Sequence, residues 1–414
     1  MANSITLATL EKPSLTVSSI GTLLARHYGL HMVSCQKLNS YEDLNFRVKV
    51  ESYGDNWMAT CGHDYIFKVL NKQNSQNTKY IEAQHEMMSR VCEIGILTPR
   101  AVPTLTGHLY LTVNLPDEGC ENTDITGQSS LYVMRLFEYI PGTILQSAPL
   151  TPGLCYKVGV MAGRVDTALK GFNHSGFHGK KITWHPDHLP LIVNLLHVVE
   201  DSGDREMVID IIKTFQSSVL EHLNEFPQGT IHGDLNEGNI LVTEAADDDR
   251  WRDEHDVSAI LDYGDSAYLP YIFEVAIAMA YMSILSDNIP PQTASGYVLA
   301  GYLTQNDLSD TEMELLQLCV CARITQSLVI GAYSFHVDPS NIYTLNTAKK
   351  GWPRLRQLWK MDSEQLVREW RNIARTCEKP LVADDEDDGD AGDAGDAGDA
   401  VESAAAAADD DDDD

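Results

Sequence analysis

The apolar pattern of this chain changes at the Pro141-Gly142 pair, and this change constrains the fold more than any other sequence feature. Before it, short apolar runs bounded by turn residues predict β-strands. After residue 150, apolar residues recur at helical spacing over long stretches, with only two short strand signals. The sequence therefore predicts an α+β protein with a small β-rich lobe (1–140), a larger, mainly α-helical lobe (141–382) and a C-terminal tail (383–414).

The same pattern predicts where the elements lie. We expect strands at 46–50, 64–70, 109–113, 131–140, 240–242 and 257–262. We expect helices at 16–29, 79–94, 158–170, 189–225, 270–286 and 311–335.

Charge is concentrated at the C-terminus. The formal net charge is −31, but residues 383–414 contain sixteen acidic residues and no Lys or Arg. This segment has almost no apolar bulk and repels itself, so it is expected to be disordered. The rest of the chain carries about −15. That balance argues against non-specific binding to nucleic acid, because a phosphate backbone requires a basic protein face.

No segment predicts membrane insertion or secretion. The N-terminus lacks a charged segment followed by an apolar one, and no run of eighteen apolar residues occurs. The longest candidate, 272–285, is interrupted by Glu274 and suits a buried helix. The eight cysteines are scattered and form no zinc-ligand set. We interpret them as reduced thiols, so the expected location is cytoplasmic and no membrane partner is expected.

Two short segments of the larger lobe carry polar residues in an order that indicates phosphoryl transfer. The first, I-H-G-D-L-N-E-G-N-I-L-V, places Asp234 and Asn239 five residues apart in a loop before a strand. The second, I-L-D-Y-G-D, places Asp262 directly after a β-rich run. Phosphoryl transfer needs a carboxylate that orients the acceptor hydroxyl and oxygen ligands for Mg²⁺ on the nucleotide phosphates. We predict Asp234 for the first role, Asn239 and Asp262 for the second, and His232 as a hydrogen-bonding support of the loop.

Each of these segments alone is a common turn sequence, but their order and distance behind a β-rich lobe are hard to explain structurally. Together they resemble the catalytic motif and metal-binding turn of the aminoglycoside phosphotransferase and choline kinase superfamily, over residues 20–375. This resemblance implies a two-lobed protein-kinase-like fold. Stretches such as S-Y-E-D-L-N-F-R-V and I-L-D-Y-G-D-S-A-Y-L-P-Y are closer to a branch that acts on 5-hydroxy-L-lysine. That branch implies GTP as donor and this small hydroxylated amino acid as acceptor.

The resemblance also implies residues for nucleotide binding. Lys68, in Y-I-F-K-V, matches the strand lysine that contacts the α- and β-phosphates. The loop at 40–46 takes the place of the phosphate-covering loop but lacks the G-x-G-x-x-G of protein kinases, so Ser40 and backbone amides have to replace it. Backbone groups at Glu138 and Tyr139 are expected to meet the base, although the sequence does not distinguish guanine from adenine there.

The helix at 79–94 is expected to supply a carboxylate partner for Lys68. Glu82 and Glu86 lie one turn apart on the same face, and the family spacing points near Gln84. We favour Glu82.

Two further sets complete the predicted site. Asp265 is expected to support the metal site without binding the ion directly. A cationic acceptor amine would be met by carboxylates and aromatic faces in the larger lobe. The candidates are Trp184, Tyr268 and Glu274, with Arg323 for an acceptor carboxylate.

Two alternatives stay open at this point. The acceptor could be ethanolamine, choline or homoserine, since such a kinase differs only in its acceptor pocket. A nucleotide-binding pseudokinase is the non-catalytic alternative. Degenerate relatives usually lose the base or the metal ligands, whereas this chain retains Asp234, Asn239, Asp262 and Lys68.

Overall fold

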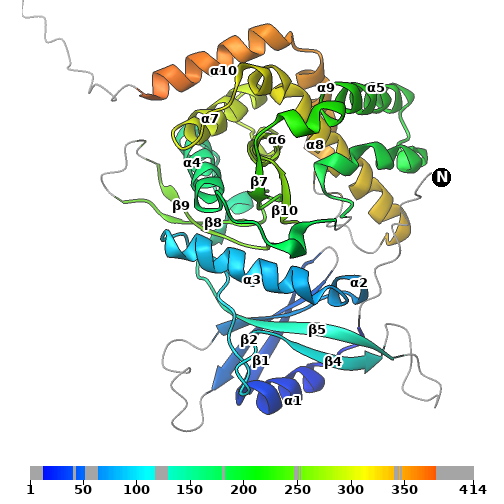
Figure 1. Cartoon of the computed structure of the whole chain (residues 1–414), viewed down its shortest axis with the longest axis vertical. Helices are drawn as coiled ribbons and strands as arrows, with labels where there is room; N and C mark the ends of the chain where they lie inside the picture. The colour runs from blue at the N-terminus through cyan, green and yellow to red at the C-terminus, as the bar shows by residue number, and fades with distance from the viewer. Residues whose placement is uncertain are drawn as a thin grey trace, which may run out of the picture. The chain divides into compact units, whose positions relative to one another are not determined.

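Figure 1 shows the computed structural model of this chain. The structure describes residues 13–40, 43–51, 64–116, 129–179, 182–246, 251, 253–339, 345 and 347–378. The chain divides into two units, Met1–Lys379 and Pro380–Asp414, and the second unit lies outside the described residues together with the predicted tail. The boundaries at 140/141 and 382/383 stay predictions.

The N-terminal lobe is built on one antiparallel sheet of five strands in the order β1-β2-β3-β5-β4. The strands are β1 (His31–Leu38), β2 (Leu44–Glu51), β3 (Asp64–Val69), β4 (Leu111–Pro116) and β5 (Ser129–Glu138). The central strand, β3, carries Lys68, whose register partners are Asn45 of β2 and Arg135 of β5. The sheet therefore fixes a lysine and an arginine side by side.

Helix α1 (Val17–Tyr28) covers one face of this sheet (Figure 1). Thr16 caps its N-terminus by accepting a backbone N–H, and Gly29 ends it in the left-handed conformation, with a φ of 68°. The buried residues Ile20, Leu24 and Tyr28 recur every four residues and form the stripe that packs on the sheet. The predicted helix and its end at Gly29 are confirmed.

Helix α3 (Thr78–Glu93) lies on the opposite face of the sheet, towards the larger lobe (Figure 1). Ile81 packs against Val133 of β5, whereas Tyr80 and Met87 belong to the core of the larger lobe. Packing on both sides fixes the rotation of α3 about its own axis. That rotation decides which of its polar residues reach the space between the lobes.

The C-terminal lobe is mainly helical, and one apolar core joins its helices. Two small antiparallel sheets, β7-β10 and β6-β8-β9, lie within it. The predicted α+β class, with a β-rich and a mainly helical lobe, is confirmed. Its helices are α4 (Pro152–Ala168), α5 (Ser202–Ser218), α6 (Tyr271–Leu285), α7 (Pro291–Leu303), α8 (Asp310–Val337), α9 (Ala348–Trp359) and α10 (Ser363–Glu378). Its strands are β6 (Thr143–Ile144), β7 (Gln228–Ile231), β8 (Ile240–Glu244), β9 (His255–Ile260) and β10 (Ala267–Pro270), and the short α2 (Lys72–Ser75) belongs to the other lobe.

The sequence pattern misses several elements. Strands β7 and β10 are four residues each and pair with each other, so neither is long enough to carry a pattern of its own. Strand β1 and helices α7, α9 and α10 are also missed. Residues 189–198, the first part of the predicted helix at 189–225, belong instead to a 3-10 helix, Pro186–Val198. Pro190 inside it has no N–H to donate, which disfavours continuous α-helical hydrogen bonding.

Helix α8 is long and apolar enough to cross a membrane by length and composition alone. However, 89% of its most apolar stretch is buried inside the lobe. Its Ser309–Glu312 capping box is that of an ordinary helix start. We interpret α8 as the central core helix of this lobe.

Helices α4 and α7 approach each other so closely that glycine is required between them. A Cβ on Gly159 would lie 1.8 Å from the carbonyl oxygen of Val298, and backbone cannot yield as a flexible side chain can. We expect Gly159→Ala to lower the free energy of unfolding by about 1–3 kcal/mol or more. Thermal or denaturant unfolding measures this. Gly171→Ala gives a comparison, because no atom lies within 4 Å of its added Cβ although its φ is +78°.

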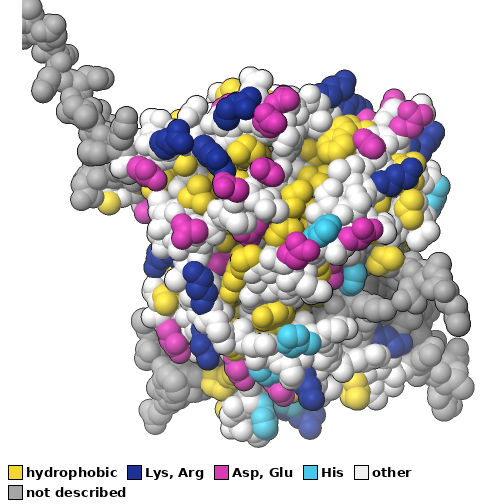
Figure 2. Space-filling model, turned by 45° about the horizontal axis from the view of Figure 1, so that its top comes forward, with side chains coloured by type: hydrophobic (Ala, Val, Ile, Leu, Met, Phe, Trp, Pro, Cys, Tyr) yellow, Lys and Arg dark blue, Asp and Glu magenta, His cyan; other side chains and the backbone are white. Residues whose placement is uncertain are grey.

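Charges of both signs are interspersed on the face shown in Figure 2. Several basic side chains of the helical lobe are paired with acids. Lys350 Nζ lies 2.7 Å from Asp287, and Arg356 contacts Asp204 at 2.6 Å. These cations are therefore not free to form a single basic patch.

Candidate active site

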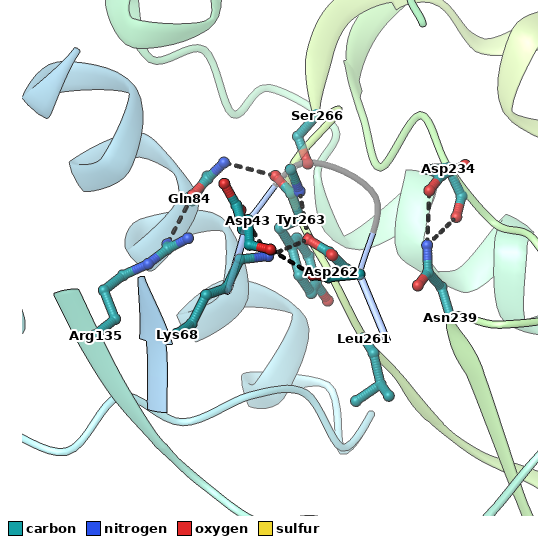
Figure 3. Close-up of polar contacts among 12 residues, drawn as sticks. Asp43, Lys68, Gln84, Arg135, Asp234, Asn239, Leu261, Asp262, Tyr263 and Ser266 are labelled. Carbon is teal, nitrogen blue, oxygen red and sulfur yellow. Dashed lines mark hydrogen bonds and ion pairs between the residues drawn. The ribbon is translucent and has the colours of Figure 1, made fainter. Parts of the chain in front are cut away.

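A cleft of about 760 Å³ is lined by both lobes and collects most of the predicted site residues. It is where β3 and β5 of the sheet face the loops around β8 and β9 (Figure 3). The predicted residues that line it are Ser40, Lys68, Glu138, Tyr139, Trp184, Asp234, Asn239, Asp262 and Asp265.

The loop between β7 and β8 positions Asp234 from both of its carboxylate oxygens. Oδ2 accepts hydrogen bonds from the Nδ2 atoms of Asn239 (2.7 Å) and Asn236 (2.9 Å). Oδ1 accepts from Nη2 of Arg323 at 2.7 Å, across 89 residues of sequence. Burial raises the pKa of the Asp234 carboxyl to about 6, against the opposing effect of Arg323. The carboxylate is thus fixed in orientation and can accept a proton near neutral pH.

His232 lies behind the loop and does not line the cleft. Its Nδ1 accepts from the Asp234 N–H at 3.3 Å, so its Nε2 is the atom that donates to the Leu261 carbonyl at 2.9 Å. Burial lowers the pKa of His232 to about 4, so the ring is neutral at physiological pH. The imidazole connects the loop that carries Asp234 to the turn that carries Asp262.

Gly233 allows these two segments to meet. Its φ is +80°, and an added Cβ would lie 2.5 Å from the Asp265 carbonyl oxygen. Its N–H donates to Oε2 of Glu274 at 3.1 Å. Glu274 is fully buried beneath the loop and does not line the cleft, so its predicted role as an acceptor contact is corrected to a support of the catalytic loop.

The turn after β9 presents Asp262 to Lys68. Asp262 has a φ of 52°, a left-handed conformation that Asp tolerates better than most residues. Lys68 Nζ donates to Asp262 Oδ1 at 2.9 Å and lies 3.3 Å from Asp43 (Figure 3). Burial alone would raise the pKa of Asp262, but Lys68 outweighs it and holds that pKa below its usual value. Burial opposes the charge on Lys68, but Asp262 and Asp43 together raise its pKa. Both groups are therefore ionised.

Helix α3 supports this turn through neutral groups. Nε2 of Gln84 donates to the Tyr263 carbonyl at 2.8 Å, and its Oε1 accepts from Nη1 of Arg135 at 2.7 Å. The Tyr80 hydroxyl donates to the Gly264 carbonyl at 2.6 Å. The prediction that Glu82 pairs with Lys68 is not met. Glu82 is exposed and accepts from the Tyr110 hydroxyl, because the packing of α3 turns Gln84 towards the cleft.

This arrangement predicts opposite outcomes for two neighbouring substitutions. Gln84→Ala removes the link between Arg135 and the metal turn and leaves a buried guanidinium with one partner fewer, so we expect a loss of about 1–3 kcal/mol in stability and weaker nucleotide binding. Glu82→Ala is expected to stay within about 0.5 kcal/mol and to leave nucleotide affinity unchanged. Denaturant unfolding and nucleotide titration measure both. Equal losses of affinity would show that Glu82 does pair with Lys68 in the nucleotide-bound enzyme.

The residues suit a hard divalent cation. Asp262 offers carboxylate oxygens, and Asn239 offers Oδ1, because its Nδ2 is directed at Asp234. Oxygen ligands of this kind, one or two from the protein and the rest from phosphates and water, are what Mg²⁺ takes in nucleotide sites. The donor set therefore fits the predicted metal.

The predicted base-binding segment lines the cleft, but two of its backbone N–H groups are engaged within the protein. Glu138 and Tyr139 line the cleft, and the Arg47 guanidinium lies over the Tyr139 ring at 4.0 Å. However, the Glu138 N–H already donates to the Arg100 carbonyl (3.0 Å) and the Tyr139 N–H to that of Asp64 (3.2 Å). Their amides are thus engaged within the protein.

The phosphate-covering loop is described in part. Residues 41 and 42 lie outside the described residues. The Ser40 hydroxyl lines the cleft and donates to the Asp43 carbonyl, while Asp43 accepts from the Asn71 N–H at 2.9 Å. Ser40 is thereby held at the cleft edge.

The acceptor candidates do not all face the cleft. Trp184 does. Tyr268 lies on β10 with its ring 5.1 Å from that of His178, and it does not line the cleft. Arg323 is buried behind Asp234 and donates to the Trp184 carbonyl at 2.9 Å. The predicted acceptor contacts of Tyr268 and Arg323 are therefore corrected. Tyr268 packs beside His178, and Arg323 positions Asp234.

The structure adds cleft residues that the sequence analysis does not single out for these roles. Asp43, Arg135 and Glu237 line the cleft beside the predicted residues. Burial raises the pKa of the Glu237 carboxyl to about 7. Glu237 lies inside the loop that carries Asp234 and Asn239, so its position in the sequence was enough to mark it as a candidate site residue. Asp43 and Arg135 reach the site only through strand pairing, which a single sequence does not reveal.

A group of potential metal ligands lies apart from this constellation. Ligand atoms of His185, Asp187 and His188 lie within 4.8 Å of one another. Nδ1 of His188 is 2.6 Å from the Ile182 carbonyl. Asp187 adds a carboxylate to the two histidines, but no second observation points to an ion.

Comparisons with known proteins agree with this geometry. The model of the phosphotransferase enzyme family matches residues 34–307. Hydroxylysine kinase of Mus musculus is 32% identical over 374 residues, covering 89% of this chain and 96% of that protein. Hydroxylysine kinase of Bos taurus is 33% identical over 380 residues, with the same coverage. Among solved structures, amicoumacin kinase hAmiN in complex with AMP-PNP, Ca²⁺ and Ami is similar, with a TM-score of 0.59 at 16% identity, covering 85% of this chain and 97% of that one.

The structural likeness shows the predicted two-lobed kinase-like fold, and the sequence matches show the family. The branch indicated by the sequence, that of hydroxylysine kinases, is confirmed as the source of close relatives. On these findings, the chain belongs to the phosphotransferase enzyme family.

Proposed function

We propose that this chain is a kinase that transfers the terminal phosphate of GTP to the hydroxyl of 5-hydroxy-L-lysine. The observation that carries the proposal is the convergence of Lys68, Asp234, Asn239 and Asp262 on one cleft. Phosphoryl transfer requires these groups together, and the chain is related over most of its length to hydroxylysine kinases.

The residues that converge on the cleft have separate tasks in this scheme. Lys68 remains cationic and is held at the cleft by Asp43 and Asp262, so it is positioned to contact the donor phosphates. Asp234 accepts the hydrogen bond of the acceptor hydroxyl and its proton as the phosphate is transferred. Arg323 and Asn239 keep that carboxylate in place. Such catalysis is mostly positioning and electrostatics, with no covalent intermediate on the protein.

Asp262 and Asn239 are the residues that would hold Mg²⁺. When bound, the cation neutralises charge on the β- and γ-phosphates. The Lys68–Asp262 pair keeps the Asp262 carboxylate ionised, as metal binding requires.

The base is expected to meet the segment that joins the lobes. Because the amides of Glu138 and Tyr139 are engaged, we assign the donor role to the next amide, that of Ile140, which lines the cleft. Ile66, Phe137 and Leu261 supply apolar cleft surface for a purine. We propose a cytosolic location as well, since Cys35, Cys92, Cys155, Cys319 and Cys321 are free thiols.

Release of nucleoside diphosphate by the purified full chain with Mg²⁺ tests the proposal. GTP and ATP are supplied in parallel with 5-hydroxy-L-lysine, lysine, ethanolamine, choline or homoserine. We expect GDP release with hydroxylysine and none with lysine, since lysine lacks the acceptor hydroxyl. Release only with another amino alcohol would replace the acceptor, and preference for ATP would replace the donor. Nucleotide binding without turnover on any acceptor would favour a pseudokinase.

A further inference from the structure

One cleft carboxylate has no task in the scheme above. Glu237 lies three residues after Asp234 in the same loop and lines the same cleft. Its Oε2 is shielded from solvent and has no hydrogen-bond partner among the described residues. A carboxylate oxygen buried without a partner lowers the stability of the folded chain. The presence of such a group beside the proposed reacting centre points to a bound ligand that satisfies it.

The cations near Glu237 are committed elsewhere. Arg323 donates to Asp234 and to the Trp184 carbonyl. Lys350 Nζ pairs with Asp287 at 2.7 Å. Neither Arg323 nor Lys350 forms an ion pair with Glu237, so its carboxylate is available to a bound cation.

The rest of this cleft wall suits an organic ammonium group. Trp184 and Tyr281 line it with aromatic surface, and Ser327 adds a hydroxyl. A carboxylate beside aromatic faces is the combination that recognises alkylammonium ions. Lys68, which is positioned to contact the donor phosphates, lines the same cleft from the other lobe, which leaves the Glu237 wall to the acceptor.

We propose that Glu237 is the specificity-determining residue for the acceptor, and that its carboxylate binds the ammonium group on the carbon next to the reacting hydroxyl. This inference rests on the proposed function. Hydroxylysine carries its C6 ammonium next to the C5 hydroxyl. Asp234 and Glu237, three residues apart in one rigid loop, would hold the hydroxyl and the ammonium of this vicinal pair at the same time.

The test compares two acceptors in the full-length enzyme. The second acceptor is 2-amino-5-hydroxyhexanoate, which keeps the hydroxyl but lacks the C6 ammonium. We expect the unaltered enzyme to prefer hydroxylysine, and Glu237→Gln to raise the KM for hydroxylysine about 10- to 100-fold, the usual effect of losing a charged hydrogen bond. The KM for GTP should stay within about twofold, because the nucleotide residues are untouched. Glu314→Gln, an exposed change of the same kind on α8, is the matched control.

The discrimination ratio separates recognition from folding. If Glu237 binds the ammonium, Glu237→Gln loses activity on hydroxylysine but little on the analogue, so the preference between them collapses. Equal losses on both acceptors, or an unchanged preference, would overturn this inference while leaving the proposed function intact. Absence of hydroxylysine phosphorylation by the unaltered enzyme would overturn both.

Discussion

Asp234→Asn should lower turnover by about 10²–10⁴-fold, the usual contribution of a positioned general base, while nucleotide binding persists. The carboxamide cannot take the acceptor proton. In addition, both carboxylate oxygens accept hydrogen bonds, one from Arg323 and the other from Asn236 and Asn239. An amide NH₂ in either place would face another donor, so the side chain cannot keep its present orientation.

Steady-state turnover and titration with a fluorescent nucleotide measure the two effects separately. Asp307→Asn provides the control, because Asp307 is exposed in a loop away from the cleft. Turnover near that of the unaltered enzyme would remove Asp234 from the role of base. A parallel loss of nucleotide affinity would instead indicate that the loop has collapsed.

Asp262→Ala is expected to abolish metal-dependent nucleotide binding and to lower turnover by at least about 10²-fold. The substitution removes a metal ligand and the closer of the two anions that hold Lys68. It also places alanine at a φ of 52°, a left-handed conformation that is unfavourable for residues with a Cβ. Alanine has no polar side chain whose local hydrogen bond could offset this cost.

Nucleotide titration over a range of Mg²⁺ concentrations measures this loss. Asp262→Asn is the informative companion, since asparagine tolerates the left-handed conformation and keeps an oxygen ligand. We expect it to bind nucleotide more weakly than the unaltered enzyme but better than Asp262→Ala. Unchanged Mg²⁺ dependence in Asp262→Ala would contradict the assignment of Asp262 as the metal ligand.

The chemical groups of the site and their local arrangement follow from short stretches of sequence. Asp234 and Asn239 are five residues apart in one loop, so their contact depends on short-range geometry that the sequence specifies. The same holds for Asp262, which follows its strand directly, and for the helix end at Gly29. The change of apolar pattern near residue 141 likewise predicts the β-rich and helical lobes.

Contacts made across long stretches of chain depend on how the helices and strands pack. Gln84 rather than Glu82 faces the cleft because packing against both lobes fixes the rotation of α3. Arg323 meets Asp234 from 89 residues away, and Lys68 is paired by Asp43, the residue directly before β2. Spacing along a sequence specifies which residues share a turn. Which distant side chain then fills the space beside them depends on the volume and rotation of whole elements, and these emerge only when the core is packed.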